Sequence, residues 1–551
     1  MPKQGRGRWW GLLAISLGVA TIIVDVTIVN VAVPAIIADL GVSSAGAQWV
    51  QEAYTLVFAS LLLVVGRFAD RAGRRRMFVV GVLVFVVASL LAASAGSGAE
   101  LIGARVLQGL GGAMMLPTSL SLLNANFVGR ERAIAFAVWG STIGGAAALG
   151  PLLGGWLTTE LSWRWAFGIN LPIGVLVVVA TLALVPESRD DRVERGIDLV
   201  GALLSVLGMT GVVFALIEGR TYGWWGLAKP ITLFGLDWPA AISPVPVVGL
   251  AGLAALALLV THQVRRNRLG RTALIDLSLF RIGSFRVGVT AAAIVSLGEF
   301  GLLFALPLWY QNVLGYSAFH TGLALLPLAV GSFLSSALGA LLVKRWGTTR
   351  VVQLGVAAEI AGIAGLGLVV APDTRWWAPL GLLFVYGVGV GLATAQLTGV
   401  SLREVPVRRS GQGSGVQSTA RQVGSALGIA VLGTVLFAGL SGLLGARLAD
   451  RSELDPTQRE QVVTEVRESG GAAIAGLAAD PRTAPIAEEA KAAFADATRY
   501  AAFTAAGFLL IGLIACARLP RDRPGAAEPA PTPQPAASPA GQTAEGLAAP
   551  G

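Results

Sequence analysis

The chain has 551 residues, of which 54% are hydrophobic and 13% charged, with a formal net charge of +9. Ordinary soluble domains carry roughly 25% charged residues, so a water-soluble globule is excluded because it could not hide this much apolar surface. One cysteine and two histidines exclude a disulfide scaffold, and we expect no metal site and no cofactor. The basic excess lies in short loops between apolar stretches, so we expect no nucleic acid partner.

Apolar stretches of about 20 residues recur along the chain and predict an all-α polytopic membrane protein. The first stretch follows a basic N-terminus, as in a signal peptide, but it contains Asp25 and Asn30 and lacks a cleavage site. We therefore expect it to be an uncleaved helix. The fourteen predicted transmembrane spans cover residues 11–34, 48–66, 77–96, 101–123, 133–157, 165–185, 198–217, 243–261, 287–311, 321–343, 351–371, 377–400, 415–440 and 500–517.

Lysine and arginine gather in alternate loops, which predicts the orientation of the chain. With the N-terminus inside, the inner segments carry 28 basic residues and the short outer loops carry 4. Both termini are therefore expected in the cytoplasm, with the protein embedded as a monomer in the plasma membrane bilayer.

A short internal repeat divides the chain into two halves. Gly66–Arg76 aligns with Ala340–Arg350 at an offset of 274 residues, and Gly109–Gly111 aligns with Gly387–Gly389 at an offset of 278. Such repeats are typical of secondary transporters. The predicted units are a cytoplasmic N-terminus (1–10), an N-terminal six-helix half (11–186), a two-helix insertion with its inner linker (187–261), a cytoplasmic loop (262–286), a C-terminal six-helix half (287–517) that includes an external loop (441–499), and a disordered Pro/Ala/Gly-rich cytoplasmic tail (518–551).

The first copy of the repeat combines residue types that suit a conformational hinge. Glycine at a helix end permits close approach of another helix, and Asp70 can accept hydrogen bonds from a helix N-terminus and from arginine. The alternative is a plain basic loop at the inner membrane surface. The residues assigned to gating here are Gly66, Asp70, Arg71, Gly73 and Arg74.

Ionisable residues inside apolar spans are costly unless they are paired or hydrated, so they mark candidate sites. Asp25 lies midway along the first span and Arg105 lies in the fourth. Asp25 is interpreted as a proton-binding carboxylate, or alternatively as a structural hydrogen-bonding residue. Glu299 and Glu359 could bind protons or a cationic substrate, or make internal polar contacts. The candidates for the substrate pathway are Asn30, Gln108, Glu299, Glu359, Gln396 and Arg421, and Arg421 is expected to pair with a carboxylate such as Glu359.

The fifth span is rich in small residues. Gly140 and Gly144 are four residues apart, and a second set of glycines brackets a proline that bends the helix. This pattern predicts a close, bendable interface, which a rocking motion of the two halves requires. The alternative is a static packing interface. The gating residues assigned to this span are Gly144, Gly150, Pro151, Gly154 and Gly155.

Together these motifs resemble the major facilitator superfamily, and in particular its fourteen-helix drug:proton antiporter branch of multidrug efflux permeases. The resemblance covers the first helix around Asp25 to Pro34, the loop 66–76, the span-four sequence from Arg105 to Gly112, the glycines of span five, and Trp163–Pro172. It implies two pseudo-symmetric six-helix halves plus two inserted helices. It also implies a proton-coupling role for Arg105, whose permanent charge could hold a nearby carboxyl ionised until a conformational change separates them.

The sequence therefore predicts a proton-coupled exporter of amphipathic small molecules such as antibiotics, dyes or biocides, and not an enzyme. No phosphate-binding G-x-x-x-x-G-K-[ST] loop is present, so the energy is expected from an ion gradient. The alternatives are a dedicated exporter of one endogenous metabolite or lipid, a passive channel, and a membrane-embedded enzyme or sensor, for which the sequence lacks a catalytic constellation.

Overall fold

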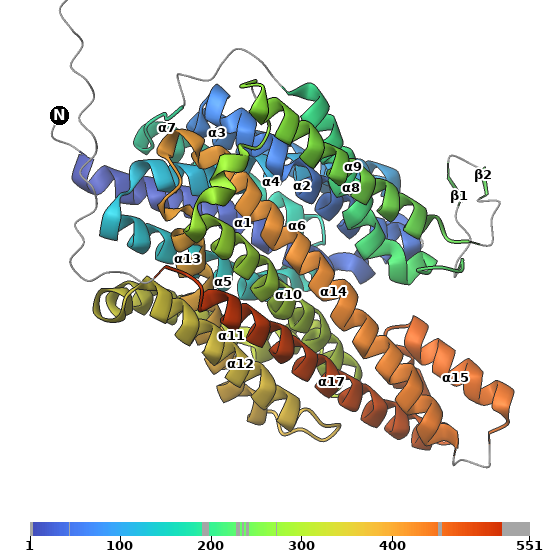
Figure 1. Ribbon diagram of the computed structural model, residues 1–551. Coiled ribbons are helices and arrows are strands. Elements are labelled where there is room, and N and C mark those ends of the chain that lie inside the picture. Colours follow the sequence, from blue (N-terminus) through green and yellow to red (C-terminus); the bar gives the residue numbers. More distant parts are fainter. Residues whose placement is uncertain are drawn as a thin grey trace, which may run out of the picture.

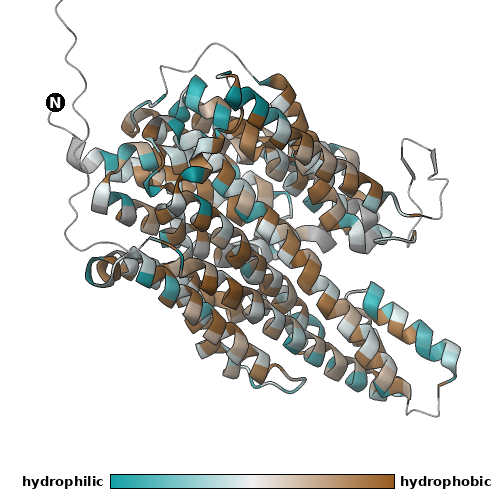
Figure 2. Cartoon of the chain, in the orientation of Figure 1, coloured by the Kyte–Doolittle hydropathy of each residue, from teal (hydrophilic) through white to brown (hydrophobic). Residues whose placement is uncertain are grey.

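The computed structural model describes residues 4–42, 44–189, 198–227, 232–233, 236–237, 242–271, 273–449 and 454–520, apart from some side chains within the helices. The described residues form a long bundle of helices (Figure 1). Hydrophobic residues dominate the middles of the helices and hydrophilic residues gather nearer their ends (Figure 2). The predicted all-α membrane fold is confirmed. Of the predicted tail (518–551), residues 521–551 lie outside the described residues.

Thirteen helices in the described part of the chain are long and apolar enough to cross a membrane. The remaining predicted span, 133–157, falls on a 32-residue helix whose apolar stretch covers only Ile134–Ile143. The number fourteen therefore stays a prediction.

The first half of the chain forms α1 (Gln4–Leu40), α2 (Ser44–Ala72), α3 (Arg74–Ala93), α4 (Gly98–Asn126), α5 (Gly129–Glu160), and the pair α6 (Trp165–Gly168) and α7 (Asn170–Leu184), which together make one span. The second half forms η1 (Leu277–Arg281), α10 (Gly283–Asn312), α11 (Ala318–Trp346), α12 (Thr348–Val369), α13 (Ala378–Arg403), η2 (Val407–Arg409), α14 (Ser410–Ala449) and α17 (Ala484–Cys516).

The internal repeat appears as a repeated backbone turn. Gly73 between α2 and α3 has φ of 105°, and Gly347 between α11 and α12 has φ of 80°. Both values lie in a region of backbone conformation that residues other than glycine rarely adopt, which explains why glycine occurs at both equivalent positions. In the first copy of this turn, Glu187 caps the N-terminus of α3. Its carboxylate accepts hydrogen bonds from the backbone N–H groups of Arg75 and Arg76 at 3.0 and 3.1 Å.

The insertion consists of α8 (Leu199–Tyr222) and α9 (Pro244–Arg268), which pack together while α8 also contacts α2 and α14. In the loop between them, β1 (Thr232–Leu233) and β2 (Leu236–Asp237) form a small antiparallel ladder. Asp198 precedes α8 and accepts hydrogen bonds from the Gly201 N–H (2.9 Å) and the Gln263 amide (2.7 Å), and it also contacts His262 Nε2 at 2.9 Å. Burial opposes ionisation here, but these hydrogen bonds outweigh it and lower the pKa of Asp198.

The predicted external loop 441–499 is largely helical. α14 has 40 residues, a length of about 60 Å, which is twice the apolar thickness of a bilayer. α14 and α17 extend together past the other helices and carry α15 (Pro456–Glu468) and α16 (Ala473–Ala479) at their far end (Figure 1). The sequence did not predict that the spans on either side of this loop continue so far.

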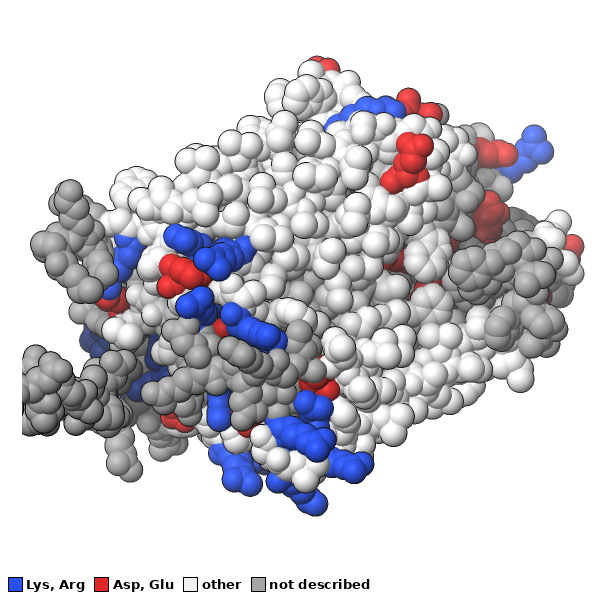
Figure 3. All heavy atoms as spheres, turned by 90° about the horizontal axis from the view of Figure 1, so that it is seen from above, with Lys and Arg blue, Asp and Glu red and all other residues white. Residues whose placement is uncertain are grey.

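Charged side chains gather at the two ends of the bundle and leave an uncharged belt between them (Figure 3). We call the end that holds the α2–α3 and α11–α12 turns the basic end. The buried apolar core is divided between the two halves, and one cluster lies inside the second half. The cluster of the first half also takes in Phe285, Leu402 and Val416 from the second half, so the two halves share apolar packing.

Candidate functional site

A buried charge cluster lies inside the first half, where α1 meets α4. Asp25 on α1 is fully buried and Arg105 on α4 is 1% exposed, and Arg105 Nη1 donates to Asp25 Oδ2 in an ion pair. Gln108, one turn after Arg105, donates to Asp25 Oδ1 at 3.0 Å. The structure therefore brings three of the sequence-predicted candidates into one network.

Two further polar residues of this network were not among the predicted candidates. Asn170, the first residue of α7, donates to Asp25 Oδ1 at 3.0 Å, and Ser89 on α3 accepts from both Asn170 and Gln108. Asn170 lies in the Trp163–Pro172 motif, which was the available signal. The carboxylate thus has compensating donors from two other helices, which is what a buried charge requires.

Arg105 also connects the network to α2. Its Nε donates to the Val50 carbonyl at 2.9 Å, and its guanidinium carbon lies 4.4 Å from the centre of the Tyr54 ring. A charge stacked on an aromatic ring in a desolvated site is stabilised electrostatically. Any event that separates Arg105 from Asp25 would therefore act on α1, α2, α4 and α7 together.

A second set of buried acids lies in the second half. Glu359 on α12 is fully buried and Glu299 on α10 is 5% exposed. Arg421 on α14 acts electrostatically on both carboxyl groups. The expected ion pair between Arg421 and Glu359 is not found among the described contacts, and both Glu359 oxygens and Glu299 Oε2 have no hydrogen-bond partner there.

Other candidates for the pathway are polar and buried without forming one site. Gln396 on α13 is 1% exposed, and its Nε2 lacks a partner among the described residues. The same holds for both amide atoms of Gln417 on α14, which was not a candidate. Asn30 lies on α1, but its side chain is outside the described part of the structure.

The basic end joins the two halves through Asp70. Its carboxylate accepts from the Gly411 N–H at 2.7 Å and from the Gln412 N–H at 3.0 Å, and both N–H groups lie in the first turn of α14. Arg74 donates to the same carboxylate at 2.6 Å and to the Val407 carbonyl of the second half. A helix N-terminus and an arginine are the two kinds of donor expected from the sequence, and here one of them belongs to the opposite half.

Gly66 allows the helices to meet at this point. A Cβ on Gly66 would overlap the Gly411 carbonyl oxygen and lie 3.0 Å from Gly415 Cα, so α2 and α14 touch through their backbones. Arg71 is exposed at the end of α2. A Cβ on Gly73 would lie 2.8 Å from the Glu187 carboxyl carbon.

Further hydrogen bonds between the halves lie at the same end. Asn124 donates to Ser410 Oγ at 2.7 Å, Ser414 donates to the Pro117 carbonyl at 2.8 Å, and Arg132 donates to the Arg403 carbonyl at 3.2 Å. The hydrogen bonds that the described residues make between the halves thus gather at the basic end, which is closed.

The glycines of α5 face several neighbours. A Cβ on Gly140 would lie 2.7 Å from the Ala395 Cβ of the second half, and one on Gly155 would lie 3.6 Å from Phe319. Gly150 corrects the prediction, because it faces Thr27 on α1 and so tightens the first half instead of the interface. Gly154 is buried. Gly144 and Pro151 lie on α5, but their surroundings are outside the described part of the structure.

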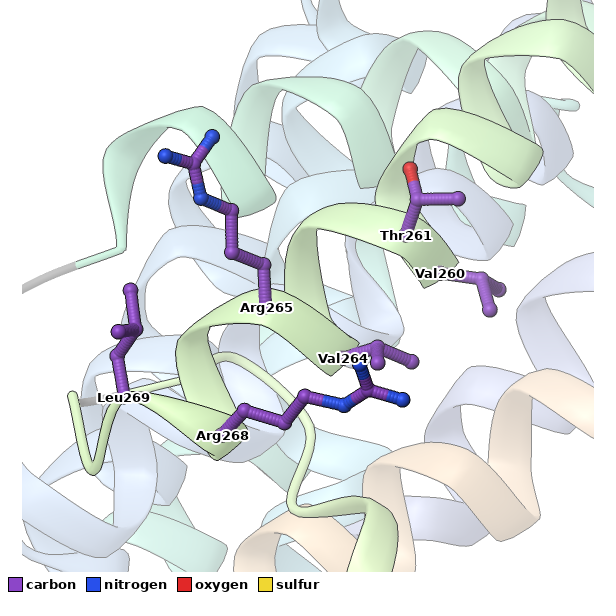
Figure 4. A pocket seen from close by; sticks show the side chains of 6 residues that line it. All are labelled: Val260, Thr261, Val264, Arg265, Arg268 and Leu269. Atoms are coloured by element: carbon purple, nitrogen blue, oxygen red, sulfur yellow. The ribbon is translucent and has the colours of Figure 1, made fainter.

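Surface grooves lie away from these clusters. One of about 450 Å³ follows the last turns of α9, where the Arg265 and Arg268 side chains extend to different sides of the helix (Figure 4). Another of about 750 Å³ is lined by α11, α12 and α17 and includes Trp346 and Arg350. Basic and apolar side chains in one groove suit lipid headgroups and tails.

Comparison with known proteins gives consistent matches. Residues 15–429 match the Major Facilitator Superfamily. The chain is 37% identical to a probable actinorhodin transporter of Streptomyces coelicolor, over 80% of this chain and 74% of that protein, and 37% identical to the puromycin resistance protein pur8 of Streptomyces alboniger, over 80% and 84%. It is 30% identical to the tetracenomycin C resistance and export protein of Streptomyces glaucescens, over 94% and 92%.

Solved structures share the fold at low sequence identity. The human organic anion transporter MFSD10 matches with a TM-score of 0.57 at 12% identity, over 93% of this chain and all of that chain. The proton:xylose symporter XylE matches with a TM-score of 0.55 at 14% identity, over 86% of this chain and 96% of that chain.

Proposed function

Because this chain belongs to the Major Facilitator Superfamily, we propose that it is a secondary exporter that moves amphipathic small molecules outward in exchange for protons. The chain covers most of the length of relatives that are named for the transport or export of small molecules or for resistance to them. The observation that carries the proton-coupled mechanism is the enclosed Asp25–Arg105 pair.

Protonation of Asp25 is the proposed coupling step. The carboxylate is the negative partner of Arg105, and a proton would cancel that charge while leaving the guanidinium buried. Leaving one member of a buried ion pair alone costs roughly 3–5 kcal/mol, which is enough to drive a rearrangement of the helices that hold it. Return of Arg105 to Asp25 would then expel the proton on the other side of the membrane.

The energy available from a proton matches this task. One proton entering across 100 mV supplies about 2.3 kcal/mol, and each pH unit adds about 1.4 kcal/mol. Since a tenfold substrate gradient costs about 1.4 kcal/mol, one proton could sustain a gradient of roughly two to three decades.

The proposed orientation places the basic end in the cytoplasm of the plasma membrane, with both termini on that side. The concentration of basic residues in the loops of this end supports it, since such loops remain inside. The structure then represents the state in which the cytoplasmic side is closed by Asp70 and the contacts around it. We propose that one chain is the transporting unit, because each half contributes a complete bundle.

The test uses purified protein in liposomes with an imposed pH gradient, a fluorescent cationic dye, and an internal pH indicator. We expect dye movement with opposite proton movement, and loss of both in Asp25→Asn. The exposed residue Asp373 provides the matched control, and Asp373→Asn should behave as wild type. Dye transport that persists after a protonophore collapses the gradient would refute the mechanism.

A second candidate is an exporter dedicated to one compound. The relatives named above each carry the name of a single molecule, whereas another relative, at 35% identity, is named multidrug resistance protein Stp of Mycobacterium tuberculosis. Growth of cells with and without the gene on a chemically varied panel separates the two. Protection against many unrelated compounds supports the broad exporter, and protection against one supports the dedicated one.

A further inference from the structure

We propose that Glu299 and Glu359 form a second proton-binding site, enclosed in the second half, in which the two carboxyl groups hold one proton between them. This deepens the proposed proton antiport and rests on it for its role in transport. Both residues are buried within one bundle, with Glu359 fully enclosed.

The internal repeat places Glu299 where the first half has Asp25. The two residues are 274 positions apart, which is the offset between the turn glycines Gly73 and Gly347. α10 and α1 are therefore equivalent helices that carry a carboxyl group at the same level. The repeat relates the two sites in position, but it does not require that their negative charges be compensated in the same way.

A second equivalence joins Tyr386 and Gln108. They are 278 positions apart, the offset of Gly109 and Gly387. Gln108 donates to the carboxylate in the first half, whereas the Tyr386 hydroxyl donates to the backbone carbonyl of Glu299 at 3.1 Å. The second half thus has a hydrogen-bond donor at the equivalent position, but this donor binds the backbone and not the carboxyl group.

Charge balance differs between the halves. In the first half an arginine pairs directly with a single carboxylate. In the second half Arg421 acts on two carboxyl groups without an ion pair to either among the described contacts. Both Glu359 oxygens are buried without a hydrogen-bond partner there, and an uncompensated charge in that position is strongly disfavoured.

One shared proton resolves the imbalance between two buried carboxyl groups and a single arginine. It leaves a single negative charge in the pair, which the positive charge of Arg421 can offset, and it removes the repulsion between two carboxylates. The other titratable groups that act on or are acted on by the pair are Tyr386 from α13 and Cys516 from α17. Neither carries a positive charge, so neither replaces the proton.

The close packing favours a proton over an organic cation. α12 and α13 touch through glycines, and a Cβ on Gly389 would lie 2.5 Å from the backbone nitrogen of Glu359 and 2.6 Å from its Cγ. On the side where α13 packs, the stem of Glu359 therefore leaves no space for a drug-sized molecule, whereas a proton requires none.

The experiment is infrared spectroscopy of the full-length protein in liposomes at neutral pH, without transported substrate. We expect an absorption band of a protonated carboxyl group that is lost in E359Q and kept, at a shifted frequency, in E359D. The exposed Glu160 supplies the control, so E160Q should keep the band unchanged.

The proposal is overturned if wild type shows no such band, or if E359Q keeps it. Removal of the band by the cation tetraphenylphosphonium would instead make this an organic-cation site and would also overturn it. The readout requires no transport, so its result is separate from that of the proposed function: a band that persists in D25N liposomes unable to exchange dye for protons leaves this site intact.

Discussion

Asp70→Asn should open the basic end of the transporter. In the structure the Asp70 carboxylate is fully buried and accepts hydrogen bonds from Arg74 and from two N–H groups at the start of α14. The substitution leaves the Arg74 guanidinium, only 1% exposed, without its negative partner. Removing one member of a buried pair costs roughly 3–5 kcal/mol. Because asparagine keeps one oxygen acceptor, we expect a cost at the lower end of this range, about 3 kcal/mol.

That cost applies mainly to the closed state, because the second half encloses the Arg74 guanidinium through Val407 only while the two halves meet, and water can solvate the guanidinium once they separate. A change of about 3 kcal/mol shifts the ratio of closed to open molecules roughly a hundredfold toward open. Spin labels on Val128 and Val407, exposed residues of opposite halves at the basic end, report the separation. The native Cys516 is replaced by alanine so that only the two introduced cysteines are labelled.

We expect a single short distance in the wild-type background and a second, longer one in Asp70→Asn. Asp39→Asn is the matched control, because Asp39 pairs with Arg164 within the first half at the opposite end of the bundle. An unchanged distance distribution in Asp70→Asn would show that this carboxylate does not hold the halves together.

Three further predictions concern other parts of the bundle. Gly140→Val should abolish transport while leaving the protein in the membrane, because a Cβ added there would lie only 2.7 Å from the Ala395 Cβ of the second half. Normal dye export by this variant would show that α5 is not part of the moving interface. Asn170→Leu should reduce proton-coupled transport at least tenfold, because it removes a buried donor to Asp25 worth roughly 1.5–3 kcal/mol; wild-type rates in liposomes would contradict this. The pKa of Asp198 is lowered in the folded state, so its stabilising contribution is present above the unfolded value of about 3.9 and is lost as pH falls through the folded pKa. The protection factor of the amides at the start of α8, which is measured relative to the intrinsic exchange rate at each pH, should therefore fall in acid in wild type and already be low at neutral pH in Asp198→Asn. Equal protection in both proteins at neutral pH would refute the assignment.

The sequence predicted the helices well because apolar runs and loop charges are local properties. The turn glycines Gly73 and Gly347 were visible as a repeat and have the positive φ that explains it. The extension of α14 to Ala449 was missed because the predicted span 415–440 is already long enough to cross a bilayer, so nothing in its length required further turns. Those turns pack against α15 and α17.

The candidate site was predicted in part. Ionisable residues in spans identified Asp25, Arg105, Glu299 and Glu359, because burial of charge is improbable without a reason. The partners could not be predicted, since they depend on which helix faces meet. Asn170 supplies a hydrogen bond across 145 residues of sequence, and the motif that contains it marks the segment but not the partner.

The insertion must accommodate movement of the two halves, and its contacts indicate how. The linker that follows α9 is held by directional bonds to the second half: the Asp276 N–H donates to Gln412 at 2.8 Å, and the Asp276 carboxylate pairs with Arg409 at 2.8 Å. The middle of the contact between α8 and α2 is instead apolar, with Met209 and Val213 packed on Ala59. Apolar contacts have no preferred direction, so sliding there costs less than breaking the linker's hydrogen bonds. When the basic end opens, α8 and α9 should therefore move with the second half and slide along α2.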